Sequence, residues 1–173
     1  NTFIIYIATY AFYRIDLHLQ LKSKKKFHYY ISILFLVTII YKMIIYHPFQ
    51  NIYFNNYFKK ISHQNFEIDY DGLSGKKFLE EILALEKNKN VISIGVASWY
   101  PLHRSIKLLD KKDRQKINIV GQEFKKADYI YSNFTSEVDK NLNDKYKIPS
   151  NFTTISKFIL DDIIVYEVFK KNK

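Results

Sequence analysis

Two carboxylates, Asp69 and Asp71, stand on either side of Tyr70 and are the residues best suited to chemistry. Carboxylates at this spacing can hold Mn²⁺ or Mg²⁺ together with a diphosphate. The same residues also suit a turn, because Asp and Gly are common turn residues and Gly72 follows directly. The apolar strand that should precede such a metal site is too short here. We therefore favour the turn, and no metal site is predicted.

Other patterns that carry chemistry are incomplete in this sequence. The segment 72–77 (GLSGKK) partly matches the phosphate-binding loop pattern G-x-x-x-x-G-K-[ST]. However, only two residues separate its glycines, and Lys77 occupies the position of the Ser or Thr hydroxyl. The chain has four glycines, at positions 72, 75, 95 and 121, and their spacing does not match a dinucleotide-binding fingerprint. The five histidines are scattered, cysteine is absent, and there is no G-x-S-x-G sequence for a hydrolase nucleophile. The sequence therefore predicts no catalytic residue and no cofactor.

The elements that would position these residues alternate between strands and helices. The spacing of apolar residues predicts a helix over 75–87 with Ser74 as its N-cap, and Pro101 could begin the next helix. Extended segments are expected at 66–70, 91–97, 117–120 and 128–132, and a closing hairpin at 153–160 and 163–170. This order predicts the fold class α/β: a small three-layer α/β domain over 65–173 with a C-terminal β-hairpin.

The most apolar stretch of the chain is 27–46 (FHYYISILFLVTIIYKMIIY). Twenty helical residues extend roughly 30 Å, which is about the thickness of the hydrocarbon core of a bilayer. Lysines precede this stretch and tyrosines lie near both of its ends, as at membrane interfaces. The alternative is a buried helix of a soluble domain, but a helix that is apolar on every side needs a larger protein around it. The sequence therefore predicts a transmembrane helix over 27–46, the last span of its protein.

The basic residues before this stretch predict its orientation and its partner. Residues 1–47 carry six basic residues and one acidic residue, half of the net charge of +10. By the positive-inside rule, the N-terminal side is cytoplasmic, and 65–173 is extracytoplasmic at the bacterial inner (plasma) membrane. Anionic lipid headgroups are the expected partner of the basic cluster, and no nucleic acid is expected. The cluster consists of Lys22, Lys24, Lys25 and Lys26.

The flanking segments complete the predicted domain organisation. Residues 1–13 are apolar but too short to span a bilayer. We interpret them as the truncated end of a preceding span, in a fragment of a longer protein. The alternative is a short interfacial helix. Residues 14–26 would then be a basic cytoplasmic loop, and 1–46 the membrane segment. Pro48 ends the helix, and the aromatic residues of 47–64 suit an interfacial linker.

Several short blocks of the sequence are similar to a known group of proteins. These are the blocks 47–55 (HPFQNIYFN), 66–74 (FEIDYDGLS), 127–133 (ADYIYSN) and 164–170 (IVYEVFK). They resemble the region after the last membrane span in bacterial multi-spanning glycosyltransferases of the GT-C type, which are similar to the family 39 protein mannosyltransferases. That group has H-P-[YF]-x-x-x-Y-[YF]-N, then [FY]-E-x-D-Y-W-G-x-S, then A-D-Y-[VI]-x-x-N. Asp71 departs from its tryptophan, and its Gly-Gly linker is missing between Asn55 and Phe66.

The resemblance implies the C-terminal part of an integral membrane glycosyltransferase whose donor is a polyprenyl-phosphate-linked sugar. In that class the catalytic acid lies in the first external loop, so no catalytic residue is assigned here. The alternative is a non-enzymatic, membrane-anchored extracytoplasmic binding domain, and a soluble basic nucleic-acid binder is a further one. Glu67 and Trp99 could each be structural or functional. The substrate-binding candidates are the residues at the junction with the external domain: His47, Tyr53, Asn55, Asp69 and Tyr70.

Overall fold

The computed structural model of the chain describes residues 10, 11, 13, 14, 17, 25–52, 59, 66–136 and 140–172. The chain divides into two compact units, Asn1–His47 and Pro48–Lys173. Each unit is described by itself. The first contains the helix α2 (Lys25–Ile45), and the second contains the sheet and all the other elements named below.

The helix α2 corrects the prediction of a membrane span over 27–46. Among the described residues, no helix combines the length and the apolar character that crossing a bilayer requires. The helix is 21 residues long and begins at Lys25 and Lys26. The transmembrane helix in the predicted fold class is therefore wrong.

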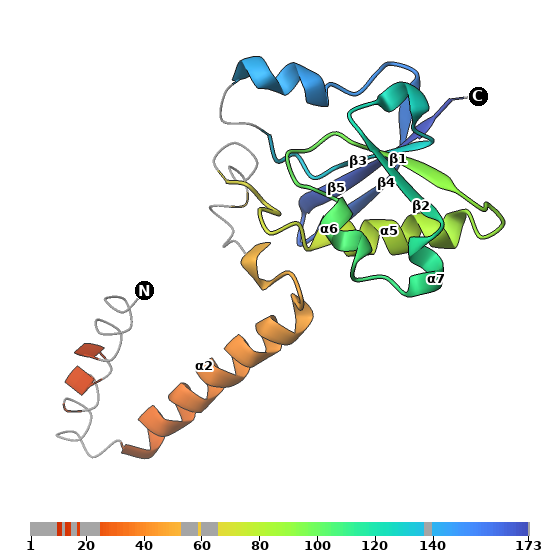
Figure 1. Ribbon diagram of the computed structural model, residues 1–173. Helices are drawn as coiled ribbons and strands as arrows, with labels where there is room; N and C mark the ends of the chain where they lie inside the picture. Colours follow the sequence, from red (N-terminus) through yellow and green to blue (C-terminus); the bar gives the residue numbers. More distant parts are fainter. Residues whose placement is uncertain are drawn as a thin grey trace. The chain divides into compact units, whose positions relative to one another are not determined.

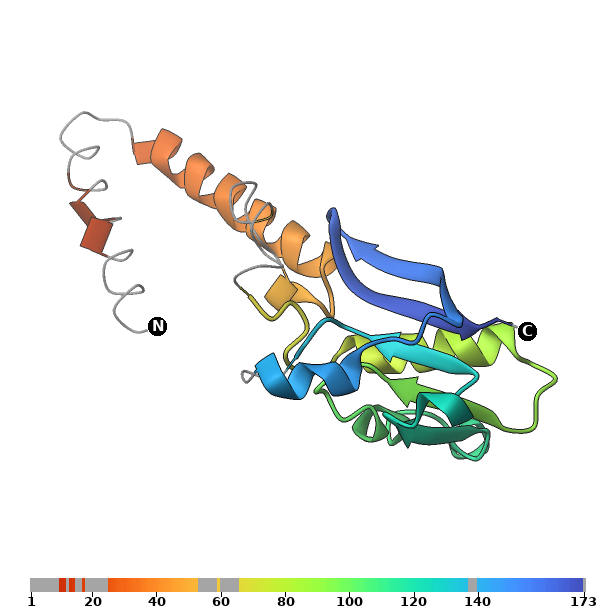
Figure 2. The same ribbon diagram turned by 90° about the horizontal axis from the view of Figure 1, so that it is seen from above.

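The second unit contains a mixed five-stranded sheet with the strand order β2-β1-β3-β5-β4 (Figures 1 and 2). Strand β1 is parallel to both β2 and β3, while β5 is antiparallel to both β3 and β4. The elements follow one another as η1 (Gln50–Ile52), α5 (Ser74–Leu85), β1 (Ile92–Val96), α6 (His103–Ile106), α7 (Lys111–Arg114), β2 (Ile117–Gly121), η2 (Phe124–Lys126), β3 (Tyr129–Ser132), η3 (Lys140–Tyr146), β4 (Phe152–Leu160) and β5 (Ile163–Lys171).

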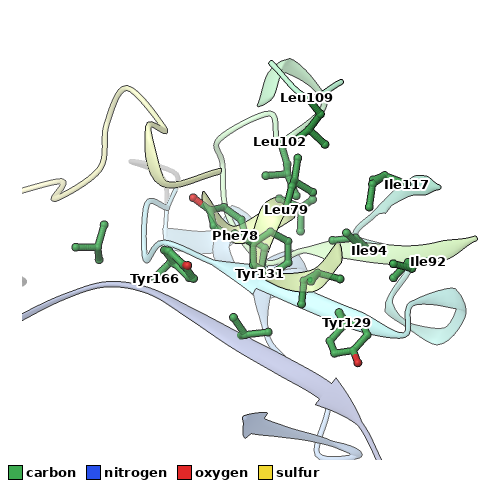
Figure 3. Close-up of a cluster of buried hydrophobic side chains, with 14 of the residues drawn as sticks. Phe78, Leu79, Ile92, Ile94, Leu102, Leu109, Ile117, Tyr129, Tyr131 and Tyr166 are labelled. Atoms are coloured by element: carbon green, nitrogen blue, oxygen red, sulfur yellow. The ribbon is translucent and has the colours of Figure 1, made fainter. Parts of the chain in front are cut away.

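The main core lies between α5 and one face of the sheet. The side chains of Phe78, Leu79 and Ile82, at helical spacing on α5, are fully buried. They meet aromatic and aliphatic side chains of the strands, including Tyr131, whose ring centroid lies 4.9 Å from that of Phe78 (Figure 3). Burial of this apolar surface is the main driving force for closing α5 onto the sheet.

The start of the second unit also belongs to this core. Phe49 and Ile52 are 5% and 1% exposed and are part of the same hydrophobic cluster. The ring of Phe49 packs on that of Phe158 in β4, with centroids 5.2 Å apart. The predicted boundaries of the linker 47–64 stay a prediction, and most of that segment lies outside the described residues.

The opposite face of the sheet is covered differently, which corrects the predicted three-layer architecture. A smaller cluster there contains Phe124 of η2, Ala127 and Ile130, with Ile148 packed against it. In the described part of the chain, this face is covered by 3-10 helices and loops, while α5, α6 and α7 lie on the other side of the sheet (Figure 1). The connection from β2 to β3 is too short, at seven residues, for a packed α-helix.

The positions of the strands agree with the sequence-based predictions, whereas the predicted strand at 66–70 and the predicted N-cap at Ser74 do not. All five strands lie within or close to the predicted ranges, and the hairpin turns at Asp161 and Asp162, which have φ of 50° and 67°. The segment 66–70 is a bend followed by a turn instead of a strand. Ser74 is inside α5 and is not its N-cap. Along β4, the register with β5 shifts between Thr154 and Ser156 and again between Phe158 and Ile159.

Candidate functional site

The candidate site lies where the parallel strands β1 and β3 end. After β1 the chain goes to β2 on one side, and after β2 it crosses to β3 on the other side of β1. In sheets of this kind, ligands bind beyond the carboxyl ends of the strands at the point where the order reverses. Ser98 and Trp99 lie just beyond β1, and Asn133 lies just beyond β3.

A buried polar cluster joins these strand ends to the start of α5. Asp69 is completely buried, and its Oδ2 accepts a hydrogen bond of 2.6 Å from Ser74 Oγ and one of 3.2 Å from Asn133 Nδ2. The hydroxyls of Ser74 and Tyr131 are 2.6 Å apart. The backbone N–H of Ser74 also points to the Asp69 carboxylate, at 3.3 Å. Asp69 thus takes the place of an N-cap for α5, a role in which a carboxylate satisfies unpaired N–H groups.

The same cluster holds the segment that follows β1. Ser98 Oγ donates to Asn133 Oδ1 and accepts a 3.0 Å bond from the N–H of Tyr100. The N–H of Trp99 donates to the Thr135 carbonyl over 2.9 Å. The side chain of Ser98 and the backbone of Trp99 are therefore both held by residues that follow β3.

Burial determines the electrostatics of this cluster. Removal of water raises the pKa of Asp69 above its ordinary value, and hydrogen bonds from Ser74 and Asn133 oppose that rise. Burial, followed by the charge of Asp69, raises the pKa of Tyr131 well above the usual range for tyrosine. Each hydrogen-bond partner of the Asp69 carboxylate can act as a donor to it. The cluster is therefore internally satisfied and acts as a structural anchor.

The Asp-x-Asp segment forms the turn that the sequence favours. The N–H of Gly72 donates to the Asp69 carbonyl over 2.9 Å, and Gly72 has a φ of +64°. Asp69 is buried, while Asp71 is exposed. No group of three His, Cys, Asp or Glu side chains suited to a metal ion occurs among the described residues.

A cavity opens on the outer side of this anchor. Its volume is about 410 Å³, and it is lined by Tyr70, Asp71, Trp99, Tyr100, Pro101 and Arg104. The rings of Tyr70 and Trp99 are stacked, with centroids 6.4 Å apart and planes inclined by 23°. Tyr70 and Trp99 remain 58% and 47% exposed, so their surfaces are accessible to a ligand.

Gly72 sets the position of one wall of this cavity. A Cβ atom at Gly72 would lie 2.1 Å from the ring of Tyr100, so the ring occupies the space that any other residue would fill. The positive φ of Gly72 is likewise unfavourable for other residues. The turn 69–72 and the segment after β1 therefore fit together only with glycine at this position.

The sequence-predicted site residues are divided between several places. Asp69 lies in the buried cluster, and Tyr70 lines the cavity. His47 is exposed at the end of the first unit. Tyr53 and Asn55 lie outside the described residues, as do Lys22 and Lys24. Lys25 and Lys26 begin α2, and their side chains are not described.

The cavity also contains residues that the sequence left open or did not suggest. Trp99 could be structural or functional on sequence grounds, and it lines the cavity. Glu67 is exposed and is not among the lining residues. Arg104 was not a candidate; its position one turn after Pro101, in the segment that follows a buried strand, is the signal that could have identified it.

The chain was compared with protein families, curated proteins and solved structures. No protein-family model, no curated protein and no solved structure matches this chain.

Proposed function

We propose that residues 65–173 are an accessory, substrate-binding domain of a glycosyltransferase that uses a polyprenyl-phosphate-linked sugar. On this proposal the domain works at the outer face of the bacterial plasma membrane. The catalytic groups belong to another part of the enzyme, and the domain holds part of the donor or the acceptor. The proposal combines the resemblance in the sequence with the geometry at the ends of β1 and β3.

The supporting observation is that two distant blocks of the resemblance meet in one cluster. Asp69 and Ser74 come from the block 66–74, and Asn133 comes from the block 127–133. Asn133 Nδ2 lies 3.2 Å from both the carboxylate and the carbonyl oxygen of Asp69. These pattern positions are thus the ones that hold the cavity together. Asp128, from the second block, instead joins β3 to β1 through the N–H of Ser93 at 3.0 Å.

The chemistry of the cavity favours binding over catalysis. Asp71 is the one carboxylate among the lining residues, and Asp69 is too deeply buried to reach a substrate. Hydrolysis of glycosidic bonds uses a pair of positioned carboxylates, and the cavity lining supplies one. The same observation supports the second candidate, a non-enzymatic extracytoplasmic binding domain, because such a domain needs only the cavity.

The test compares sugar transfer with and without this domain. Membranes from cells that make the complete gene product would be supplied with a radiolabelled polyprenyl-phosphate sugar, and labelled product would be counted. We expect deletion of 65–173 to lower transfer at least tenfold, and Asn133→Ala to lower it in part. Lys111→Ala, an exposed change on α7, serves as the control. Transfer that does not depend on 65–173 would exclude the accessory role, and absence of any transfer from the intact protein would favour the binding domain.

A further inference from the structure

We infer that the cavity lined by Tyr70, Asp71, Trp99 and Arg104 binds a single hexopyranose unit of an uncharged saccharide. This inference deepens the proposed function, on which its choice of ligand class rests. The cavity volume of about 410 Å³ is within the ~300–1,000 Å³ typical of small-molecule sites.

The aromatic side chains provide the first part of the recognition. Tyr70 and Trp99 have nearly parallel rings that are both about half exposed at the cavity. A pyranose ring presents a face of C–H bonds, which carry slight positive charge and pack well on the negative face of an aromatic ring. Tyr100 and Pro101 add further apolar wall. Exposed stacked aromatics with this geometry suit a ligand that has one apolar face.

The charged side chains provide the second part of the recognition. Asp71 and Arg104 both line the cavity, are exposed, and have no side-chain hydrogen bond or ion pair within the described part of the chain. A carboxylate accepts bonds from two adjacent sugar hydroxyls, and a guanidinium donates to hydroxyl oxygens. Because these two charges are opposite, the lining has no net charge. A polyphosphate or nucleotide would therefore meet Asp71 as well as Arg104, whereas a neutral polyol can use both groups.

The rigid support of the cavity favours binding without rearrangement. Tyr70 and Asp71 directly follow Asp69, and Trp99 and Tyr100 directly follow Ser98; both anchors are buried and hydrogen-bonded to Asn133. The walls are thus set by one polar network before a ligand arrives. Preorganisation of this kind lowers the entropy lost on binding.

The experiment uses Trp99, the single tryptophan of the chain, as a reporter inside the cavity. The full chain would be titrated with methyl α-D-mannopyranoside, methyl α-D-galactopyranoside and N-acetylglucosamine, in a detergent without a sugar headgroup. We expect a saturable change in tryptophan emission with at least one hexopyranoside and a dissociation constant on the order of 1 mM. Glycerol, a polyol without a ring, should give no saturable change.

Variants locate the binding. Tyr70→Ala and Arg104→Gln should each weaken the best hexopyranoside roughly tenfold, as expected for central contacts of a small site. Leu108→Ala and Lys107→Gln are the matched controls, because both residues are exposed and close in sequence but do not line the cavity. Those controls should bind as the parent chain does. All four changes are at exposed positions, so equal melting temperatures would show that folding is intact.

Several outcomes would overturn the inference. Emission that changes only linearly with every hexopyranoside would do so, as would saturation by uridine monophosphate alone. Equal affinity in the parent chain and in Tyr70→Ala and Arg104→Gln would place the sugar elsewhere. These results are separate from the transfer assay: a domain that is needed for transfer but ignores sugars overturns only this inference. Binding of a hexopyranoside by a protein without transfer activity overturns only the proposed function.

Discussion

Asp69 is the residue on which the site is built, although it does not face the cavity. It is fully buried, and Ser74 and Asn133 donate hydrogen bonds to it. A buried carboxylate without a cation close by costs free energy unless donors surround it. The donors come from the start of α5 and the end of β3. The cost of burying Asp69 is therefore offset only when these two elements are in their native positions.

The raised pKa of Asp69 predicts how stability depends on pH. In the unfolded chain Asp69 titrates near its ordinary value of 3.8, while in the folded chain burial raises its pKa. Between these two values the folded state binds more protons than the unfolded state. The contribution of Asp69 to the free energy of unfolding therefore falls as pH rises through this window, and it is constant above the folded pKa.

Comparison with Asp69→Asn isolates this contribution. Asparagine does not titrate, so the free energy of unfolding of the parent chain minus that of the variant should fall between pH 4 and the folded pKa. The measurement is urea unfolding followed by Trp99 emission at several pH values. Glu86, whose pKa is lowered mainly by its hydrogen bond from Tyr129, gives the opposite slope in both proteins and cancels in the difference. A difference that is constant or rises with pH would contradict the prediction.

At the scale of elements, the strands were predictable because each is marked locally. β-branched and aromatic runs identify β1, β2 and β3, and two consecutive aspartates with positive φ turn the hairpin. The buried cluster was not predictable, because Asp69 and Asn133 are 64 positions apart and nothing local connects them. The sequence analysis named Asp69 as a substrate-binding candidate, whereas in the structure its side chain is fully buried. The cap of α5 was missed because its carboxylate lies five residues upstream of Ser74.

The fit between the turn 69–72 and the segment after β1 predicts a difference between two glycines. Gly72 and Gly121 have similar φ, +64° and +60°, but a Cβ would meet the Tyr100 ring at Gly72 and open space at Gly121. Gly121→Ala should therefore cost only the strain of positive φ, about 1 kcal/mol of unfolding free energy. Gly72→Ala should cost this and roughly 1–3 kcal/mol more from overpacking, and should displace Tyr100.

Thermal or urea unfolding of both variants measures this difference. Trp99 emission provides a second readout, since Trp99 is adjacent to Tyr100 and shares its cavity. We expect altered emission for Gly72→Ala and unchanged emission for Gly121→Ala. Equal stability losses together with unchanged emission in both variants would show that the contact between Gly72 and Tyr100 has no role.

At the scale of the whole molecule, the α/β character of the sheet-containing unit was predicted correctly, whereas the transmembrane helix was not. A long apolar run was interpreted as a span because its residue types match those of a bilayer-crossing helix. Among the described residues, however, no helix has both the length and the apolar character that crossing a bilayer requires. Similarly, alternation of strands and helices suggested helices on both faces of the sheet. The connection from β2 to β3 is too short to supply one.

The division into two units predicts that 48–173 folds without 1–47. The core of the second unit includes Phe49 and Ile52, so a fragment that begins at 48 keeps it complete. A fragment that begins at 66 loses both side chains and should be less stable by several kcal/mol, in line with the cost of emptying buried apolar sites. Circular dichroism during heating compares the two fragments. Equal melting temperatures would show that 48–65 lies outside the cooperative fold.

The irregular pairing of β4 has a consequence for association between molecules. A straight outer strand offers its free peptide groups as a template on which a strand of another chain can add. Strand β4 is the outermost strand on its side, and its register shifts twice along nine residues. Kinks of this kind spoil the even spacing that such an added strand would need. Ile155 and Ile159 can therefore remain exposed on an edge that resists aggregation by strand addition.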